Sequence, residues 1–286
     1  MRKFFLGVLL IIFLFVLAKV ISDTFFIKME HIEIPLPALP PVFDGLRILQ
    51  LSDLHGRRLP GDGKLAQEIK AANPDLIVLT GDYVKRKAEE IDNYYSLLEA
   101  MAAIAPVYAV SGNHDYRAGW ELVAGKLQKA GITVLDNRHV KIQKEGQELI
   151  LAGVSDPHTG HDHLPSALPP VIDAPVILLA HAPTWFVRRQ ENDSLTVLRA
   201  EDALWENVAL ILTGHTHGGQ IKLPFVGPVT TASGRLFPRD YIEGLSREGN
   251  IWLYISRGIG QSGTIPLRFL SPAEMTLITL RTTAPK

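Results

Sequence analysis

The chain has 286 residues, of which 47% are hydrophobic and 21% charged, and its formal net charge is -1. This length and composition fit one large globular domain or two small ones, and they exclude a largely disordered chain. The nearly neutral charge argues against a nucleic-acid-binding protein. The absence of cysteine excludes disulfides, thiolate metal sites and cysteine nucleophiles, so any metal must be bound by oxygen and by the ten histidines.

The chain begins with an apolar segment from Phe4 to Ile21, in which Lys19 is the one charged residue. This length is close to the roughly 17–25 residues that a membrane-spanning helix needs. A cleaved signal peptide fits the same pattern, but Val16-Leu17-Ala18 lacks a small-x-small cleavage site and bulky residues follow at 25–27. We therefore expect an uncleaved single-pass membrane anchor over residues 1–28.

The side of the membrane on which the body lies is less strongly indicated. Arg2 and Lys3 favour a cytoplasmic N-terminus by the positive-inside rule, which predicts an extracytoplasmic body. Lys19 and Lys28 flank the other end of the segment and weaken that rule. Sidedness therefore stays open in this interpretation.

A proline-rich segment at residues 29–46 follows the anchor. Proline at this density favours an extended tether, and we expect it to include an edge strand over His31–Ile34. The remaining residues, 47–286, are predicted to form one catalytic domain.

The body alternates short apolar runs with helical patterns. Apolar runs that end abruptly in polar clusters indicate buried strands, and strand–helix alternation indicates an α/β fold. The runs are Ile48–Leu51, Leu76–Thr80, Val107–Ser111, Leu149–Val154, Val176–Ala180 and Ala209–Thr213. Helices are predicted at Lys64–Ala72, Glu89–Ile104 and Gly119–Ala130, a hairpin turn at Lys144–Gln147, and later strands at Ile251–Ser256 and Glu274–Leu280.

Side chains of the types that bind metal ions follow five of these strands. They are Asp53 with His55, Asp82, Asn113, His181, and His215 with His217. Ligand sites of α/β sheets form outside the carboxyl ends of strands, so these residues are expected to share one cleft, with each i, i+2 pair pointing to one side of an extended strand end. Seven oxygen and imidazole ligands are too many for one ion that keeps a coordination position open for substrate. They suit two ions that share a bridging carboxylate.

The order of these blocks resembles a known family. Ser52-Asp53-Leu54-His55, Gly81-Asp82, Gly112-Asn113-His114-Asp115, His181 and Gly214-His215-Thr216-His217 are similar, in this order, to the signature of calcineurin-like metallophosphoesterases. The resemblance extends from about Arg47 to Leu280 and implies a four-layer α/β/β/α sandwich, here preceded by a transmembrane helix. The residues after His217 resemble the membrane-anchored bacterial subgroup. Some of its members are broad phosphodiesterases, and some relatives cleave UDP-diacylglucosamine.

The resemblance also implies a role for each site residue. Asp53, His55 and His217 would bind one metal, Asn113, His181 and His215 the other, and Asp82 would bridge the two. A hydroxide between the metals would attack phosphorus. His114 would be the catalytic residue that protonates the leaving oxygen or stabilises the transition state, with Asp115 holding its tautomer. The two divalent ions are expected to be Mn²⁺, with Fe, Zn²⁺, Ni²⁺ or Co²⁺ as alternatives.

Several further groups have both a functional and a purely structural interpretation. Arg57 and Arg58 follow His55 closely and are the preferred substrate-binding cations, ahead of residues 85–87 and Arg257. The histidine-rich loop at 156–163 is expected to be solvated rather than a further site. A set of apolar residues could form a lip for acyl chains, although core packing is the stronger interpretation for each: Trp185, Phe186, Leu223, Pro224, Phe225 and Phe237.

We therefore predict a membrane-bound, two-metal phosphoester hydrolase. Its substrate is expected to be a phosphodiester or pyrophosphate that is lipid- or nucleotide-linked, such as UDP-diacylglucosamine, with no nucleic acid and no obligate protein partner. The alternatives are a phosphomonoesterase and a non-catalytic membrane scaffold that binds metal or phosphate. Loss of His114 or of a ligand would have favoured the scaffold, and all of them are present.

Overall fold

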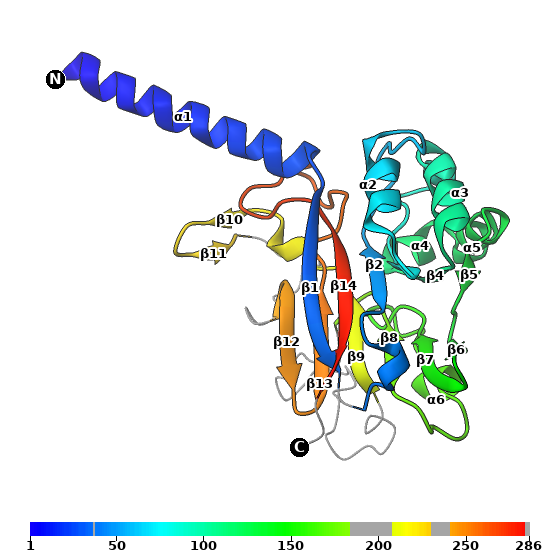
Figure 1. Cartoon of the computed structure of the whole chain (residues 1–286). Coiled ribbons are helices and arrows are strands. Elements are labelled where there is room, and N and C mark those ends of the chain that lie inside the picture. Colours follow the sequence, from blue (N-terminus) through cyan, green and yellow to red (C-terminus); the bar gives the residue numbers. More distant parts are fainter. Residues whose placement is uncertain (37, 184–207, 230–240, 284–286) are drawn as a thin grey trace, which may run out of the picture.

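The computed structural model describes residues 1–36, 38–183, 208–229 and 241–283, and its body is built on two six-stranded sheets (Figure 1). The first sheet has, in spatial order, β1 (Lys28–Leu36), β14 (Glu274–Thr282), β2 (Arg47–Leu51), β3 (Leu76–Thr80), β4 (Val107–Val110) and β5 (Thr133–Val134). The second has β12 (Gly244–Glu248), β13 (Ile251–Ile255), β9 (Val208–Thr213), β8 (Val176–Leu179), β7 (Gln147–Gly153) and β6 (Arg138–Lys144). A small hairpin, β10 (Lys222–Leu223) with β11 (Gly227–Pro228), lies apart from both sheets.

The two sheets pack face to face and helices cover their outer faces. Side chains alternate along each strand, so Ile48 packs between the sheets while its neighbour Leu49 packs under the helices. The first sheet is covered by α2 (Lys64–Ala72), the 3₁₀ helix η2 (Ala88–Asn93), α3 (Tyr95–Ile104), α4 (Asn113–Ala118) and α5 (Trp120–Lys129). The second packs against the short α6 (Leu164–Ala167). This arrangement confirms the predicted α/β/β/α class.

The strands were predicted more accurately than the helices. All six apolar runs form strands within two residues of the expected ends, and the turn between β6 and β7 is a two-residue hairpin loop. The single helix expected over Glu89–Ile104 is wrong, because the chain leaves helical geometry at Tyr94 (φ -145°, ψ 21°). The Tyr94 ring is buried there and its hydroxyl donates to the Tyr83 carbonyl at 2.8 Å, so tertiary packing breaks the helix.

The N-terminal helix α1 (Arg2–Phe25) stands away from the body, and its buried residues are Asp23 and Thr24 at its C-terminal end (Figure 1). It is long and apolar enough to cross a membrane. Its last turn is bonded to loops of the body: the Arg57 guanidinium donates to the Phe25 carbonyl at 2.6 Å, and the Arg268 backbone N–H donates to Thr24 Oγ1 at 2.9 Å. The helix therefore leaves the body at a fixed point.

The segment after the helix is part of the sheet rather than a loose tether. Strand β1 pairs in parallel with β14 from Lys28 to Leu36, which extends the edge strand expected at His31–Ile34. Ile34 and Leu36 are fully buried between the sheets, and Arg257 binds Glu30 at 2.6 Å. Without β1, strand β14 would expose both its hydrogen-bonding edge and its apolar face.

We predict that a chain starting at Arg47 is far less stable than one starting at Ser22. Fully burying Ile34 and Leu36 alone contributes about 3–6 kcal/mol, so deletion of β1 should lower the melting temperature by many degrees or cause aggregation. Thermal unfolding of the two truncated chains, followed by circular dichroism, measures the difference. Equal melting temperatures would contradict a structural role for β1.

Candidate metal centre

The predicted ligands converge on one site, and they come from both sheets. Strands β2, β3 and β4 of the first sheet end at Asp53/His55, Asp82 and Asn113, and strands β8 and β9 of the second end at His181 and His215/His217. The shared cleft expected from the sequence therefore exists, but it lies where the carboxyl ends of two packed sheets meet rather than along one sheet. All seven side chains are buried.

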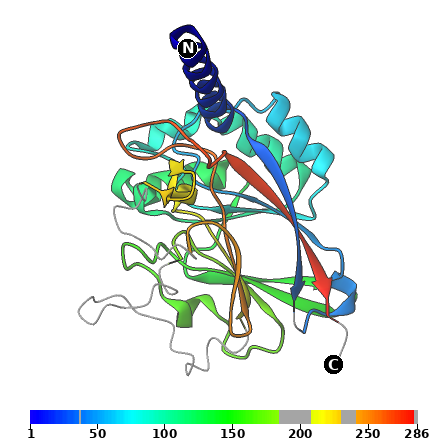
Figure 2. The ribbon, with the colours of Figure 1, turned by 90° about the vertical axis from the view of Figure 1, so that its left-hand side faces the viewer.

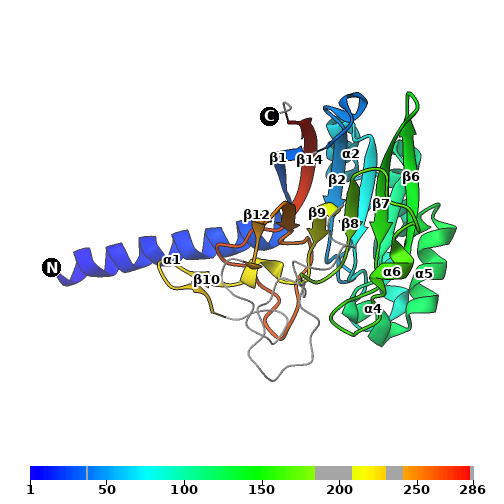
Figure 3. The ribbon, with the colours of Figure 1, turned by 90° about the horizontal axis from the view of Figure 1, so that it is seen from below.

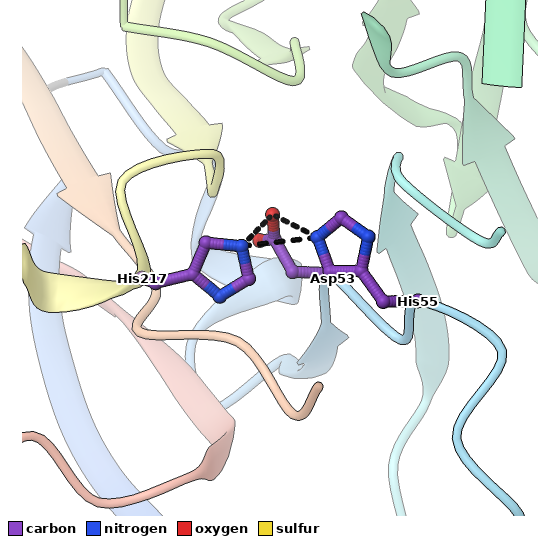
Figure 4. A group of neighbouring side chains, drawn as sticks. All are labelled: Asp53, His55 and His217. Carbon is purple, nitrogen blue, oxygen red and sulfur yellow. Dashed lines mark hydrogen bonds and ion pairs between the residues drawn. The ribbon is translucent and has the colours of Figure 1, made fainter. Parts of the chain in front are cut away.

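The first group of ligand-type atoms belongs to Asp53, His55 and His217. The Nε2 atoms of the two imidazoles are 3.0 Å apart, and Asp53 Oδ1 lies 3.4 Å from His217 Nε2 and 3.9 Å from His55 Nε2 (Figure 4). Figure 4 shows the two rings and the carboxylate pointing toward one another, with Asp53 and His55 on one loop and His217 on another. Two nitrogens and an oxygen that face a common centre form a suitable set for a divalent ion.

The second group belongs to Asp82, His181 and His215. His181 Nε2 lies 3.3 Å from Asp82 Oδ2 and 3.0 Å from His215 Nδ1. The same Asp82 oxygen is 3.5 Å from His55 Nε2 of the first group. Asp82 therefore stands between the two groups, where a bridging carboxylate would have to be.

Asn113 completes the second side of the cluster. Its backbone begins α4, and its side chain lines the same pocket as Asp82 and His215. Asn113 Oδ1 is buried and accepts no hydrogen bond from the described residues, and the same is true of Asp53 Oδ1. Buried oxygens normally have a partner, so these two atoms fit a site whose partner is a cation.

The backbone of the site adopts an unusual conformation. Five of the seven predicted ligands have left-handed φ values between 46° and 71°. They are Asp53, His55, Asp82, His215 and His217. This conformation costs energy for residues with a Cβ and is found where function requires a particular direction of the side chain. The i, i+2 pairs were expected on extended strand ends. The expected extended conformation is wrong, because left-handed turns direct the paired side chains into the site.

Close backbone approach explains the glycines between these ligands. A Cβ at Gly214 would lie 2.0 Å from Ser52 Oγ and 2.3 Å from Asp53 Oδ2. One at Gly112 would lie 2.3 Å from Asp82 Oδ1. The loops that carry His215 and Asn113 can therefore meet the loops that carry Asp53 and Asp82 only if these positions lack a side chain.

Burial keeps three of the four clustered imidazoles neutral, whereas the carboxylate of Asp82 beside His181 raises the pKa of that imidazole well above its usual range. Burial lowers the pKa of His55 to about 3, and it holds the pKa values of His215 and His217 well below their usual range. These imidazoles are therefore neutral at physiological pH and offer a lone pair to a metal. Burial raises the pKa of Asp53 to about 6, because a carboxylate enclosed without a compensating cation is disfavoured.

A surrounding layer of hydrogen bonds orients the rings. The Thr80 carbonyl lies 2.8 Å from His181 Nδ1, which makes this nitrogen the donor and leaves Nε2 as the candidate ligand atom. Arg268 is fully buried beside His217, and its Nη1 donates to the His217 carbonyl at 3.4 Å, so it fixes the backbone of this candidate ligand. The Arg268 guanidinium also donates to the carbonyls of Gly258 and Gly260. Burial lowers the pKa of Arg268 to about 10, so it stays charged at neutral pH.

His114 lies at the rim of the cluster, with its ring edge-on to His55 at 4.8 Å between centroids. Its Nδ1 is 2.8 Å from the Lys85 carbonyl, so this backbone group holds its tautomer. The prediction that Asp115 does so is wrong. The Asp115 carboxylate instead accepts backbone N–H groups of Asp82, Tyr83 and Gly112, and thereby fixes the loop that carries Asp82.

A pocket opens over the cluster. It is lined by Asp82, Asn113, His114, Arg117, His158, His215, His217 and Ser262. Arg117 was missed by the sequence analysis, although it follows His114 by three residues on α4, a spacing that puts both on one helix face. His158, expected in a solvated loop, instead lies beside His215 with 4.8 Å between ring centroids.

Other predicted groups lie away from this pocket. The Arg57 guanidinium is bonded to the carbonyls of Phe25 and Ile259, and Arg58 is exposed. His161 stacks on Tyr116, and His163 caps α6.

Of the expected apolar lip, Trp185, Phe186 and Phe237 lie outside the described residues, whereas Leu223, Pro224 and Phe225 are exposed on the β10–β11 hairpin.

Comparison with known proteins identifies the family. The model of the calcineurin-like phosphoesterase domain matches residues 46–219, more than half of the chain and all of the predicted ligands. The chain belongs to the calcineurin-like phosphoesterase family. It is accordingly a metal-dependent phosphoester hydrolase, and the candidate ligands of this family member cluster as described above.

Its relatives include bacterial and animal proteins. The chain is 32% identical to "Uncharacterized metallophosphoesterase YkuE" of Bacillus subtilis, over 86% of this chain and 82% of the relative. It is 34% identical to "Phosphodiesterase YaeI" of Escherichia coli, over 82% of each chain. A zebrafish relative, "Transmembrane protein with metallophosphoesterase domain", is 30% identical over 89% of this chain and 57% of its own length.

We predict that Arg268→Gln weakens metal binding about 10–100-fold, the usual effect of losing a partner that orients a ligand. Titration of Mn²⁺ into the metal-stripped full chain in detergent measures the affinity. Arg281→Gln is the matched control, because Arg281 is half-buried and paired with Glu33 far from the site. Unchanged affinity in Arg268→Gln would mean that this arginine only supports the surrounding loop.

Proposed function

We propose that this protein is a two-metal phosphodiesterase or pyrophosphatase anchored in a membrane. In this proposal Asp53, His55 and His217 hold one ion, Asn113, His181 and His215 hold the other, and Asp82 bridges them. The observation that carries it is the position of Asp82 Oδ2, 3.5 Å from His55 Nε2 and 3.3 Å from His181 Nε2. Mn²⁺ is the preferred metal, because carboxylate, amide and imidazole without thiolate suit it, as they also suit Fe, Zn²⁺, Ni²⁺ and Co²⁺.

The bound ions would neutralise charge on the phosphoryl oxygens and lower the pKa of the attacking water. The chain itself supplies the groups around them. His114 Nδ1–H donates to the Lys85 carbonyl, which leaves Nε2 to take up a second proton and, from the imidazolium form, to give it to the leaving oxygen. Arg117 and His158 line the opening and would hold the remaining phosphate oxygen or the substituent of a diester. Arg58, exposed and three residues after His55 in the chain, is the second candidate for this binding role.

A diester is preferred over a monoester because a similar protein carries the name phosphodiesterase. A lipid-linked or nucleotide-linked diester or pyrophosphate, such as UDP-diacylglucosamine, fits the apolar helix α1 and the membrane-protein names of relatives. The membrane orientation bears on this choice, because a substrate made in the cytoplasm requires a cytoplasmic body. A topology reporter fused after Lys286 distinguishes that orientation from the extracytoplasmic one that Arg2 and Lys3 favour.

We expect Asp82→Asn to lower turnover of bis(p-nitrophenyl) phosphate by at least about 10²-fold, because the bridging charge is worth several kcal/mol. The assay uses the Mn²⁺-loaded full chain, with Asp92→Asn as the control, since Asp92 is an exposed acid paired with Lys126. Faster turnover of the matching monoester by the unaltered protein would favour a phosphomonoesterase. No turnover of either ester by a protein that binds two ions would favour the scaffold.

We expect His114→Gln to lower kcat about 10²–10⁴-fold while both ions stay bound. The geometry offers a competing role, because His114 also lies within ligand distance of His55 and Asp82. Metal content measured by mass spectrometry separates the two roles. Loss of an ion would make His114 a ligand, whereas His139→Gln, at a half-buried histidine bonded to Ala167, should change neither quantity.

Arg117→Ala should raise KM for the diester about 10–100-fold, the effect of one lost hydrogen bond to a charged group. Arg58→Ala is the matched comparison, because both arginines are exposed and follow a candidate ligand closely in the sequence, and only Arg117 lines the pocket. Steady-state kinetics of the two variants decide between them. A larger rise in KM for Arg58→Ala would restore the assignment made from sequence.

A further inference from the structure

Two uncharged, exposed loops lie beside the point where α1 leaves the body. The first is the tip of the β10–β11 hairpin, residues 223–229, with sequence Leu-Pro-Phe-Val-Gly-Pro-Val. The second is residues 263–267, with sequence Gly-Thr-Ile-Pro-Leu. Phe225 is completely exposed, and Val226, Ile265 and Leu267 are each more than two-fifths exposed. Grouped exposed apolar side chains of this kind mark an interaction surface.

Backbone and side-chain bonds join these two loops to each other. The Lys222 N–H donates to the Phe269 carbonyl at 2.9 Å, and the Phe269 N–H donates to the Gln220 carbonyl at 3.0 Å. The Gln220 side chain also donates to the carbonyl of Ile265 at 2.8 Å. The hairpin and the 263–267 loop therefore form one unit, which we call the apolar rim.

The apolar rim is also fixed to the end of α1. Arg268, directly after the second loop, is bonded through its backbone N–H to Thr24 Oγ1, and Gln261 donates to the Thr24 carbonyl at 3.1 Å. Phe25 and Phe26, at the end of α1, are largely exposed on the same part of the molecule. Figures 1 and 3 show the hairpin and α1 projecting from the body toward the same side, and Figure 2 shows that side facing the viewer.

We propose that the apolar rim is a second contact with the bilayer that α1 enters, so that the protein touches the membrane with its anchor and with the loops beside its active-site pocket. This inference rests on the membrane insertion of α1 proposed above. A helix whose end is bonded to the rim carries the rim to the membrane surface, where aromatic and aliphatic side chains enter the interface. The ion pair of Lys222 with Glu243 marks the polar base of the hairpin.

The position of the rim connects this contact to the substrate. Ser262 lines the pocket and is held by Gln220, which accepts its backbone N–H at 2.8 Å, and the next residue begins the second loop. One side of the pocket is therefore continuous with the rim. A phosphoester carried by a membrane lipid could reach the metal centre without leaving the interface, which narrows the substrate class to lipid-borne phosphoesters.

Single-cysteine labelling tests the bilayer contact, because the chain has no cysteine of its own. The full chain carrying Phe225→Cys is labelled with an environment-sensitive dye and reconstituted into phosphatidylcholine vesicles with or without nitroxide-labelled lipid. We expect a blue-shifted emission that the nitroxide lipid quenches several-fold. Leu267→Cys should behave alike. Leu122→Cys, 65% exposed on α5, is the matched control and should be neither shifted nor quenched.

A label at Leu10→Cys within α1 separates failure of this inference from failure of the anchor. Quenching at position 10 with none at 225 and 267 would overturn the rim contact alone. No quenching at any of the three would overturn membrane insertion and the rim contact together. A blue shift at 225 that persists in detergent and is insensitive to nitroxide lipid would mean that another protein surface covers the rim, which also overturns the proposal.

Discussion

The structure depends on the enclosure of two carboxylates and four imidazoles in one buried cluster. Asp53 and Asp82 are almost completely inaccessible to solvent, and burial keeps His55, His215 and His217 neutral. Such a cluster is unfavourable unless a cation compensates the carboxylates. Three features hold these groups together although their enclosure is unfavourable: the left-handed turns, the glycines without room for a Cβ and the buried Arg268. This is expected where binding stabilises a strained site.

The two sheets explain why this cluster can be rigid. Three ligand loops leave the first sheet and two leave the second, so the site is held by the apolar layer that joins the sheets. The loops are also tied directly to one another. The Asp53 N–H donates to the Gly81 carbonyl, and the Gly214 N–H donates to the His181 carbonyl. A shift of one strand would therefore move several ligands at once.

The apolar helix α1 and the active site are connected through a few residues. Arg57 follows the first ligand pair and holds the Phe25 carbonyl, while Arg268 bonds to Thr24 with its backbone and lies against His217 with its guanidinium. The end of α1 is thus bonded to two residues that lie next to the candidate ligands in the chain or in space. This connection is consistent with an enzyme that works at the membrane surface, since the orientation of the pocket follows from the orientation of the helix.

The sequence by itself determined most strands of the two sheets, the α/β class, the apolar N-terminal helix and the residues that cluster at the site, because these depend on local apolar periodicity and on motifs a few residues long. Tertiary structure alone decided the rest. The break at Tyr94, the pairing of β1 with β14, and the contact of Arg268 with a histidine 51 residues away arise from packing between distant segments. Asp115 was misassigned for the same reason: its sequence neighbour is His114, but its carboxylate reaches backbone N–H groups around Asp82 that only the folded chain brings within hydrogen-bond distance.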